Sequence, residues 1–236
     1  LFGVNAELLI DHAWGWEPCT ISDVKAYKPE SNSIGSGQVL HCPYNFEQGR
    51  LIVMEMTDLL VLDLVDKGLV TDQMVLTVGY DIENLTDPER SKLYKGEITT
   101  DHYGRKTPKH SLGTANFAYT SSTKRIVQEV SDLFDKIVNP DLLIRRMNIS
   151  ANRLITEGEV KEEATGSEQL SIFVDYEEEE RKRAEEKATL EKEKQMQTAI
   201  IDIKKRYGKN AILKGMNLEE GATAKDRNSQ IGGHKA

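Results

Sequence analysis

The feature that most constrains the fold is a hydrophobic period that switches repeatedly between Gln38 and Arg153. Short runs rich in β-branched residues alternate there with apolar residues at helical spacing. We expect strands at 38–44, 74–80, 111–119 and 142–149, and helices at 51–67 and after Ser122. This β-α-β-β-α-β order predicts an α+β, ferredoxin-like domain in which one antiparallel sheet packs against two helices.

The two predicted helices and the long connection between them differ in character. Residues 51–67 are apolar on nearly all sides and predict a buried helix, whereas the second helix, capped by Ser122, has a single apolar side. The polar, basic connection after Tyr80 runs for about thirty residues, which is long for a compact domain and favours a functional role.

The flanking regions predict separate parts. Residues 1–28 form a short helical piece that Asn5 opens and Gly15 ends, and 29–37 has the composition of a linker before a domain at 38–155. Residues 156–176 form an acidic linker, of which 156–170 are predicted to be disordered. Residues 177–236 predict a solvated single helix, with no sustained heptads, and then a polar tail without a core of its own.

Charge lies in blocks along the chain. The whole sequence has 31 Lys and Arg against 39 Asp and Glu, a net charge of -8, which argues against a non-specific coat on nucleic acid. Residues 90–125 nevertheless contain eight basic and two acidic residues, whereas 156–194 contain fourteen acidic and seven basic ones. The middle of the chain is therefore suited to an anion, and we expect the tail to oppose one.

The sequence offers no catalytic centre and no metal site. Its two cysteines and five histidines lack ligand spacing, and none of the predicted strands carries the acidic pair of a two-metal site. The expected strands lack the aromatic RNP pattern, which disfavours RNA-base stacking. No apolar run approaches the roughly 18 residues of a membrane span, so we expect a cytoplasmic protein that is a piece of a longer one.

Three short segments allow two interpretations each. Residues 33–37 suit a phosphate-binding nest of amides, although a flexible linker is favoured. Arg145 and Arg146 should point to opposite faces of the last strand, which leaves one on the open face or both at a solvated edge. Residues 169–173, Gln-Leu-Ser-Ile-Phe, present one amide and three apolar anchors, as either a docking peptide or a hydrophobic staple.

Several separated motifs resemble the Y-family translesion DNA polymerases of the UmuC type, the impB/mucB/samB family. Residues 1–18, including His-Ala-Trp-Gly-Trp-Glu-Pro, resemble the end of that family's thumb, and 28–40 resemble the junction into its little finger. Residues 143–149, Leu-Ile-Arg-Arg-Met-Asn-Ile, resemble its last strand, with Asn148 where glycine is common. Residues 207–234 are similar to the tails of UmuC-like proteins from Gram-positive bacteria.

The resemblance implies a function. The full-length protein would be an error-prone DNA polymerase of the SOS response. Its Mg²⁺-binding palm is absent from this sequence. This chain would therefore be the part that binds DNA and the sliding clamp, without catalytic activity or a cofactor of its own. Residues 169–173 (Gln169, Leu170, Ser171, Ile172 and Phe173) would be the clamp-binding peptide. The implied contacts to template-primer duplex are Ser36, Gly37, Lys109, Ser111, Ser122, Thr123, Lys124, Arg125, Arg145 and Arg146.

Two other classes of protein remain open from the residues alone. One is a regulatory ligand-binding module with the same sheet and no affinity for DNA. The other is an interaction protein built around residues 177–207, whose oligomerisation would depend on that helix.

Overall fold

The computed structural model describes residues 5–27, 32–100, 104–160, 176–231 and 234–235, and the chain divides into two compact units, Leu1–Ser31 and Asn32–Ala236. The first unit holds α1 (Asn5–Ala13) and α2 (Ile21–Ala26). Thr20 caps α2, because its side chain accepts the Asp23 amide while the Asp23 carboxylate accepts the Thr20 amide. The helix predicted to open at Asn5 is present.

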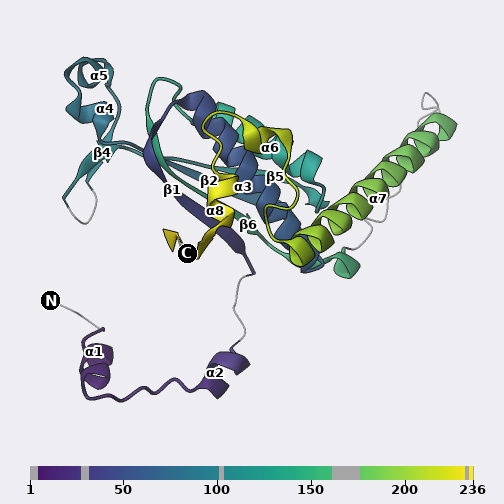
Figure 1. The fold of residues 1–236 in the computed structure, drawn as a ribbon, viewed down its shortest axis with the longest axis horizontal. Helices are drawn as coiled ribbons and strands as arrows, with labels where there is room; N and C mark the ends of the chain where they lie inside the picture. The colour runs from purple at the N-terminus through teal and green to yellow at the C-terminus, as the bar shows by residue number, and fades with distance from the viewer. Residues whose placement is uncertain (1–4, 28–31, 101–103, 161–175, 232–233, 236) are drawn as a thin grey trace. The chain divides into compact units, whose positions relative to one another are not determined.

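The second unit is built on one antiparallel sheet (Figure 1). Its strands β1 (Ile34–Tyr44), β2 (Leu69–Tyr80), β5 (Ser111–Thr120) and β6 (Ile144–Asn152) lie in the order β1-β6-β2-β5. Helices α3 (Phe46–Asp66) and α6 (Thr123–Ile137) pack against each other and against the sheet. The predicted α+β class and the β-α-β-β-α-β order are confirmed.

The core lies between the helices and one face of the sheet. Ile52, Met56 and Leu64 of α3 and Phe134 of α6 are almost fully buried there, together with Leu76 of β2. Each such side chain contributes about 1.5–3 kcal/mol by leaving water. Alternate residues of each strand face this core, so the opposite face of the sheet, called the open face below, is left for other contacts.

Four element starts differ from the predicted ones, since β2 begins at Leu69 rather than at 74 and β6 begins at Ile144 rather than at 142, and the starts of α3 and β1 also differ. Helix α3 begins five residues before Leu51, because Asn45 and Gln48 exchange side-chain-to-backbone hydrogen bonds as a capping box. Strand β1 begins at Ile34, so the predicted linker 29–37 is wrong from that residue onward. Its glycines serve close approach rather than flexibility, since a Cβ at Gly37 would lie 2.2 Å from Asn148 Oδ1 on β6.

The long connection after β2 has structure of its own. It contains α4 (Glu83–Thr86), α5 (Pro88–Leu93) and a hairpin of β3 (Ile98–Thr100) with β4 (Lys106–Pro108). The buried Asn84 fixes its base, because the amide Nδ2 donates to the carbonyl oxygens of Asp81 and Leu143, both at 2.9 Å. The same side chain accepts the Leu143 amide at 2.9 Å.

The C-terminal region continues from the sheet through β7 (Ile155–Thr156), which pairs with β2, and a 3-10 turn (Glu157–Glu159). It then contains α7 (Tyr176–Tyr207), a 3-10 turn (Gly215–Leu218), α8 (Ala224–Asn228), β8 (Gln230–Ile231) and β9 (His234–Lys235). The prediction that 156–170 is disordered is therefore wrong for its first residues, where β7 adds to the sheet.

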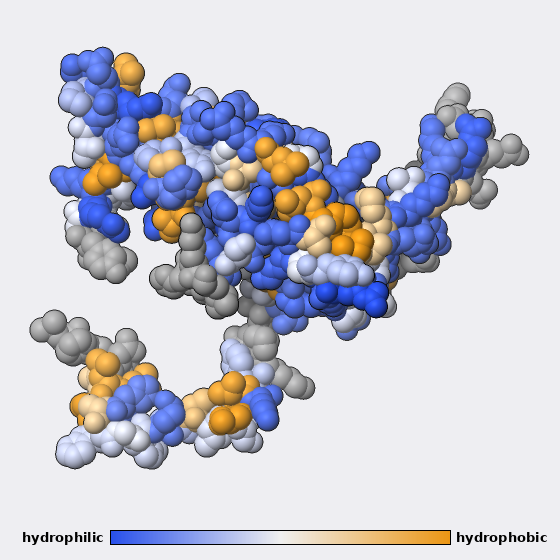
Figure 2. Space-filling model, viewed as in Figure 1, coloured by the Kyte–Doolittle hydropathy of each residue, from blue (hydrophilic) through white to orange (hydrophobic). Residues whose placement is uncertain are grey.

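The C-terminal region also packs on the domain, contrary to the prediction of a solvated helix and a tail without a core. The end of α7 and the segment after it lie against α3 (Figure 1). Two acidic residues buried on α3 explain this: Glu55 accepts hydrogen bonds from the segment after α7, and Asp58 pairs with Lys214. Figure 2 shows apolar side chains beside this junction, where Leu59, Ile200 and Leu213 line a hollow.

Candidate nucleic-acid interface

The open face of the sheet is flat at its centre, with small, neutral side chains. A hollow on this face is lined by Gly35 and Gly37 of β1, Asn148 and Ser150 of β6, and Thr77 of β2. Asn148 stands opposite Gly37 on one side and Thr77 on the other. Because the β1 residues here lack side chains on this face, a ligand could approach the strand's backbone directly.

Arg146 lies across this face at the end where β6 begins. It pairs with Gly79 of β2, and a Cβ at Gly79 would lie 2.6 Å from the Arg146 side chain. The glycine therefore lets an exposed guanidinium lie over the neighbouring strand. An exposed guanidinium beside small, uncharged side chains is suited to a phosphate group.

The prediction that Arg145 and Arg146 point to opposite faces assumed that side chains alternate strictly along the strand. That assumption is wrong here. Ile144 and Met147 are both buried although they are three residues apart, and the pairing with β2 slips between Gly79 and Tyr80. A bulge therefore inserts one extra residue, which interrupts the strict alternation of side chains. Neither arginine enters the core, and Arg145 Nε lies 3.5 Å from Asp81 Oδ2.

Basic side chains gather in a hollow of about 560 Å³ at this same end of the sheet. Arg145 and Arg146 line it together with Arg105, from the turn before β4, and His110, just before β5. Asp81 is the acidic residue of the lining. The long connection thus brings part of the basic stretch to the arginines of β6, as its length and charge suggested.

The remaining predicted contacts near this end have intramolecular partners. Lys109 Nζ lies 2.8 Å from Glu97 Oε2, and this hydrogen bond raises the pKa of the lysine. The Ser111 hydroxyl lies 2.7 Å from the Tyr80 hydroxyl, on the face that the helices cover. Lys109 can therefore reach a ligand only by leaving Glu97, while Ser111 does not belong to the open face.

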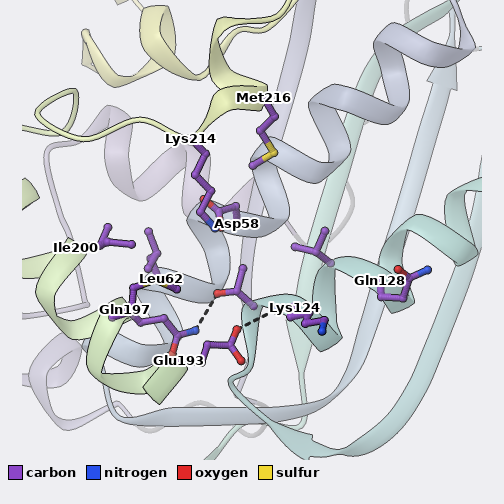
Figure 3. Close-up of a pocket in the computed structure, with 12 residues that line it drawn as sticks. Asp58, Leu62, Lys124, Gln128, Glu193, Gln197, Ile200, Lys214 and Met216 are labelled. Carbon is purple, nitrogen blue, oxygen red and sulfur yellow. Dashed lines mark hydrogen bonds and ion pairs between the residues drawn. The ribbon is translucent and has the colours of Figure 1, made fainter. Parts of the chain in front are cut away.

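Of the four predicted contacts at the start of α6, Ser122 and Thr123 are buried beneath α7, whereas the side chains of Lys124 and Arg125 are exposed. The Ser122 hydroxyl donates to Glu193 Oε2 at 2.7 Å. The Lys124 amide donates to Glu193 Oε1 at 3.0 Å (Figure 3). Gln197 Nε2 donates to Thr123 Oγ1 at 2.8 Å. The carboxylate of Glu193 thus occupies the amides and hydroxyl at this helix start, and the Arg125 side chain is exposed.

The comparison with protein families agrees with this arrangement, because residues 31–172 match the C-terminal domain of the impB/mucB/samB family. The chain belongs to the impB/mucB/samB family. A search of curated proteins finds no match to it. The family is that of the UmuC-type Y-family polymerases which the sequence resembles, and its C-terminal domain is the little finger.

The family match ends before α7, so the segments that cover α3 and α6 lie outside it. The clamp-like peptide at 169–173 lies outside the residues that the structure describes. Within the described ranges, no cluster of His, Cys, Asp or Glu is placed to hold a metal ion. None of the helices there combines the length and apolar character that a membrane crossing needs.

Sequence reasoning missed two arginines close to predicted positions of this little finger. Arg153 follows β6 in a left-handed turn, φ 51°, and donates to Asn116 Oδ1 of β5 at 2.8 Å on the open face. The left-handed conformation that places Arg153 there is rare, and the sequence gives no signal of it. Arg227 of α8 reaches β1. Its only sequence signal was Glu55 of α3, a buried acidic residue that needs a partner from another segment.

Proposed function

We propose that this chain is the DNA-binding and sliding-clamp-binding C-terminal part of an error-prone translesion DNA polymerase, acting in DNA repair and SOS damage tolerance. The observation that carries the DNA-binding part is the open face of the little finger. It combines a flat, glycine-lined strand with the guanidinium groups of Arg145 and Arg146 at one end.

This surface is suited to the sugar-phosphate backbone rather than to base edges. Gly35 and Gly37 leave the backbone of β1 accessible, and the nearby Asn148 and Thr77 are neutral. Contacts of this kind hold a duplex in place without reading its sequence, as a polymerase that crosses damaged template requires. The basic hollow adds cations that attract phosphates from a distance.

Nucleotidyl transfer is assigned to the rest of the polymerase. By resemblance, its Mg²⁺ ions would be held by carboxylates of the family's palm. The little finger would contribute affinity and orientation for the template-primer duplex.

The clamp-binding part rests on Gln169, Leu170, Ser171, Ile172 and Phe173. Leu170, Ile172 and Phe173 are compact apolar anchors for a preformed groove, and Gln169 can form a hydrogen bond at its entrance. A micromolar affinity, near -8 kcal/mol, is the expectation for so short a peptide. Tethering to the clamp would then raise the local concentration of a weak DNA-binding surface.

Titration of a labelled template-primer duplex with the whole chain tests the DNA-binding part. We expect weak binding that is equal for unrelated sequences, with log K falling against log salt at a slope of roughly -3 to -4 for about four phosphates. A matched single-stranded oligonucleotide is the control for non-specific attraction. Binding that is absent or independent of salt would favour a ligand-binding module instead.

Titration of bacterial sliding clamp against the whole chain tests the second part. The wild-type chain should bind with a dissociation constant of the order of 1 µM, and the Leu170→Ala/Phe173→Ala variant should lose at least about tenfold, because each anchor contributes about 1.5–3 kcal/mol before ordering costs. Ser167→Ala, two residues before the peptide, is the matched control and should bind like the wild type. Equal binding of all three proteins, or none by any, would contradict the assignment.

A further inference from the structure

The segment after α7 is held on the little finger by one buried carboxylate. Glu55 of α3 is 2% exposed, and its Oε2 accepts the backbone amides of Thr223 at 2.8 Å and Ala224 at 3.2 Å. Its Oε1 accepts the side-chain amide of Asn217 at 2.7 Å. These three bonds fix the start of α8 against α3, and Gln38 of β1 adds a bond of 2.8 Å to the Thr223 hydroxyl.

This anchoring places Arg227 against the strand where the phosphate contacts were predicted. Its Nη2 donates to Ser36 Oγ at 3.2 Å and to the Gly37 carbonyl oxygen at 3.4 Å. β1 is an edge strand of the sheet, so its outer backbone groups are not used by a neighbouring strand. The guanidinium therefore lies beside an open backbone edge.

Arg227 has no carboxylate partner among the described residues. Both of its hydrogen bonds go to neutral oxygens, and the nearby Glu55 already accepts three N–H groups. Partial burial lowers the pKa of the guanidinium, while the charge of Glu55 acts in the opposite direction. A partly buried cation without a close anion is costly, so an incoming phosphate would be stabilised there.

The charge of the docked segment supports an attraction to DNA rather than a repulsion. Residues 196–236 contain eight basic and four acidic residues, in contrast to the acidic stretch before them. The expectation that the whole tail opposes DNA therefore holds for 156–194 at most. The segment beside β1 is basic.

We propose that Arg227 is an additional phosphate-binding residue, which the C-terminal segment supplies to the DNA-binding edge at Ser36 and Gly37. Glu55 is then a positioning residue, since it acts through the start of α8. The inference rests on the proposed binding of duplex by the open face, whose β1 edge Arg227 adjoins from the side of α3. It adds to the little finger a contact from outside the part of the chain that matches the family.

The test compares three variants of the whole chain in the duplex titration. Arg227→Gln removes the charge but keeps amide donors for Ser36 and Gly37, so the fold should be retained. Arg227→Lys restores the charge. Lys225→Gln is the matched control, because Lys225 is exposed on the same helix. It is rotated by about 200° around the helix axis from Arg227, so the two side chains point to nearly opposite sides.

We expect Arg227→Gln to weaken duplex binding about threefold to tenfold and to reduce the magnitude of the salt slope by about 0.9, the value for one phosphate. Arg227→Lys should restore most of the slope, and Lys225→Gln should leave it nearly unchanged. Melting temperatures identify any variant that fails to fold. If Arg227→Gln fails to fold, the salt slopes of wild type, Arg227→Lys and Lys225→Gln are compared to decide whether the residue at position 227 contributes to duplex binding.

The outcomes separate this inference from the function on which it rests. If the wild-type chain binds duplex and Arg227→Gln binds it with the same affinity and slope, the inference is wrong and the proposed function stands. The inference is also wrong if Lys225→Gln has the same effect as Arg227→Gln. If the wild-type chain does not bind duplex, both are overturned.

Discussion

The two ends of the little finger sheet contain similar predicted contacts in opposite environments. At the end where β6 begins, Arg145 and Arg146 line an accessible basic hollow. At the other end, the Ser122 hydroxyl and the amide of Lys124 donate hydrogen bonds to Glu193 of α7, and the contact of Lys124 is visible in Figure 3. A motif thus assigns a residue to an element, but whether that residue is accessible depends on a helix about seventy positions later in the chain.

The largest difference between the two ends should be seen in duplex binding. We expect Arg145→Gln/Arg146→Gln to weaken binding about tenfold and to reduce the magnitude of the salt slope by nearly 2, because two phosphate contacts are lost. Lys124→Gln/Arg125→Gln removes the same charge from two exposed side chains at the start of α6, at the other end of the sheet. It should change the slope by less than about 0.5.

Fluorescence anisotropy over a series of salt concentrations measures both slopes, and thermal melting checks that both variants are folded. Equal loss of slope in the two variants would show that duplex reaches the start of α6. The contrast between the two ends would then be lost.

The sequence predicted the architecture because binary patterning is a local property. The β-branched runs and the apolar spacing of α3 and α6 each specify their element within a few residues. The predictions that were wrong concern interactions between distant residues. The bulge at Arg145 depends on register with β2, and the glycines of β1 are explained by Asn148 more than a hundred residues away.

The candidate site could be predicted in part for the same reason. Arg145 and Arg146 were found from their own strand, whereas Arg227 belongs to a segment that packs only because Glu55 is buried on α3. Glu55, one of the carboxylates within a largely apolar helix, was visible in the sequence. It indicates a buried polar partner, although not which segment provides one.

The docked segment also changes what truncation should do. Deleting 156–236 removes the acidic stretch but leaves Glu55 without the two amides and the Asn217 side chain that it binds. A carboxylate adapted to three buried donors would then face water beside exposed apolar residues of α3. Tighter DNA binding of such a fragment would therefore not report on electrostatic repulsion alone.

The smallest effect is expected from the contact that covers the start of α6. Glu193→Gln keeps an oxygen for the Lys124 amide and an amide group for the Ser122 hydroxyl, so mainly the charge near the positive end of the helix dipole is lost. The free energy of unfolding should fall by about 0.3–1 kcal/mol. For a chain of this size, the melting temperature should fall by about 1–3 °C.

Glu186→Gln is the matched control, since Glu186 is exposed on the same helix and undergoes the same change of charge. Both variants alter the net charge equally, so any general electrostatic effect cancels in the comparison. A specific contact lowers the melting temperature only in Glu193→Gln. If the two variants melt alike, the Glu193 carboxylate does not stabilise the start of α6, and the covered end of the sheet is held by Gln197 and the apolar side chains of α7 instead.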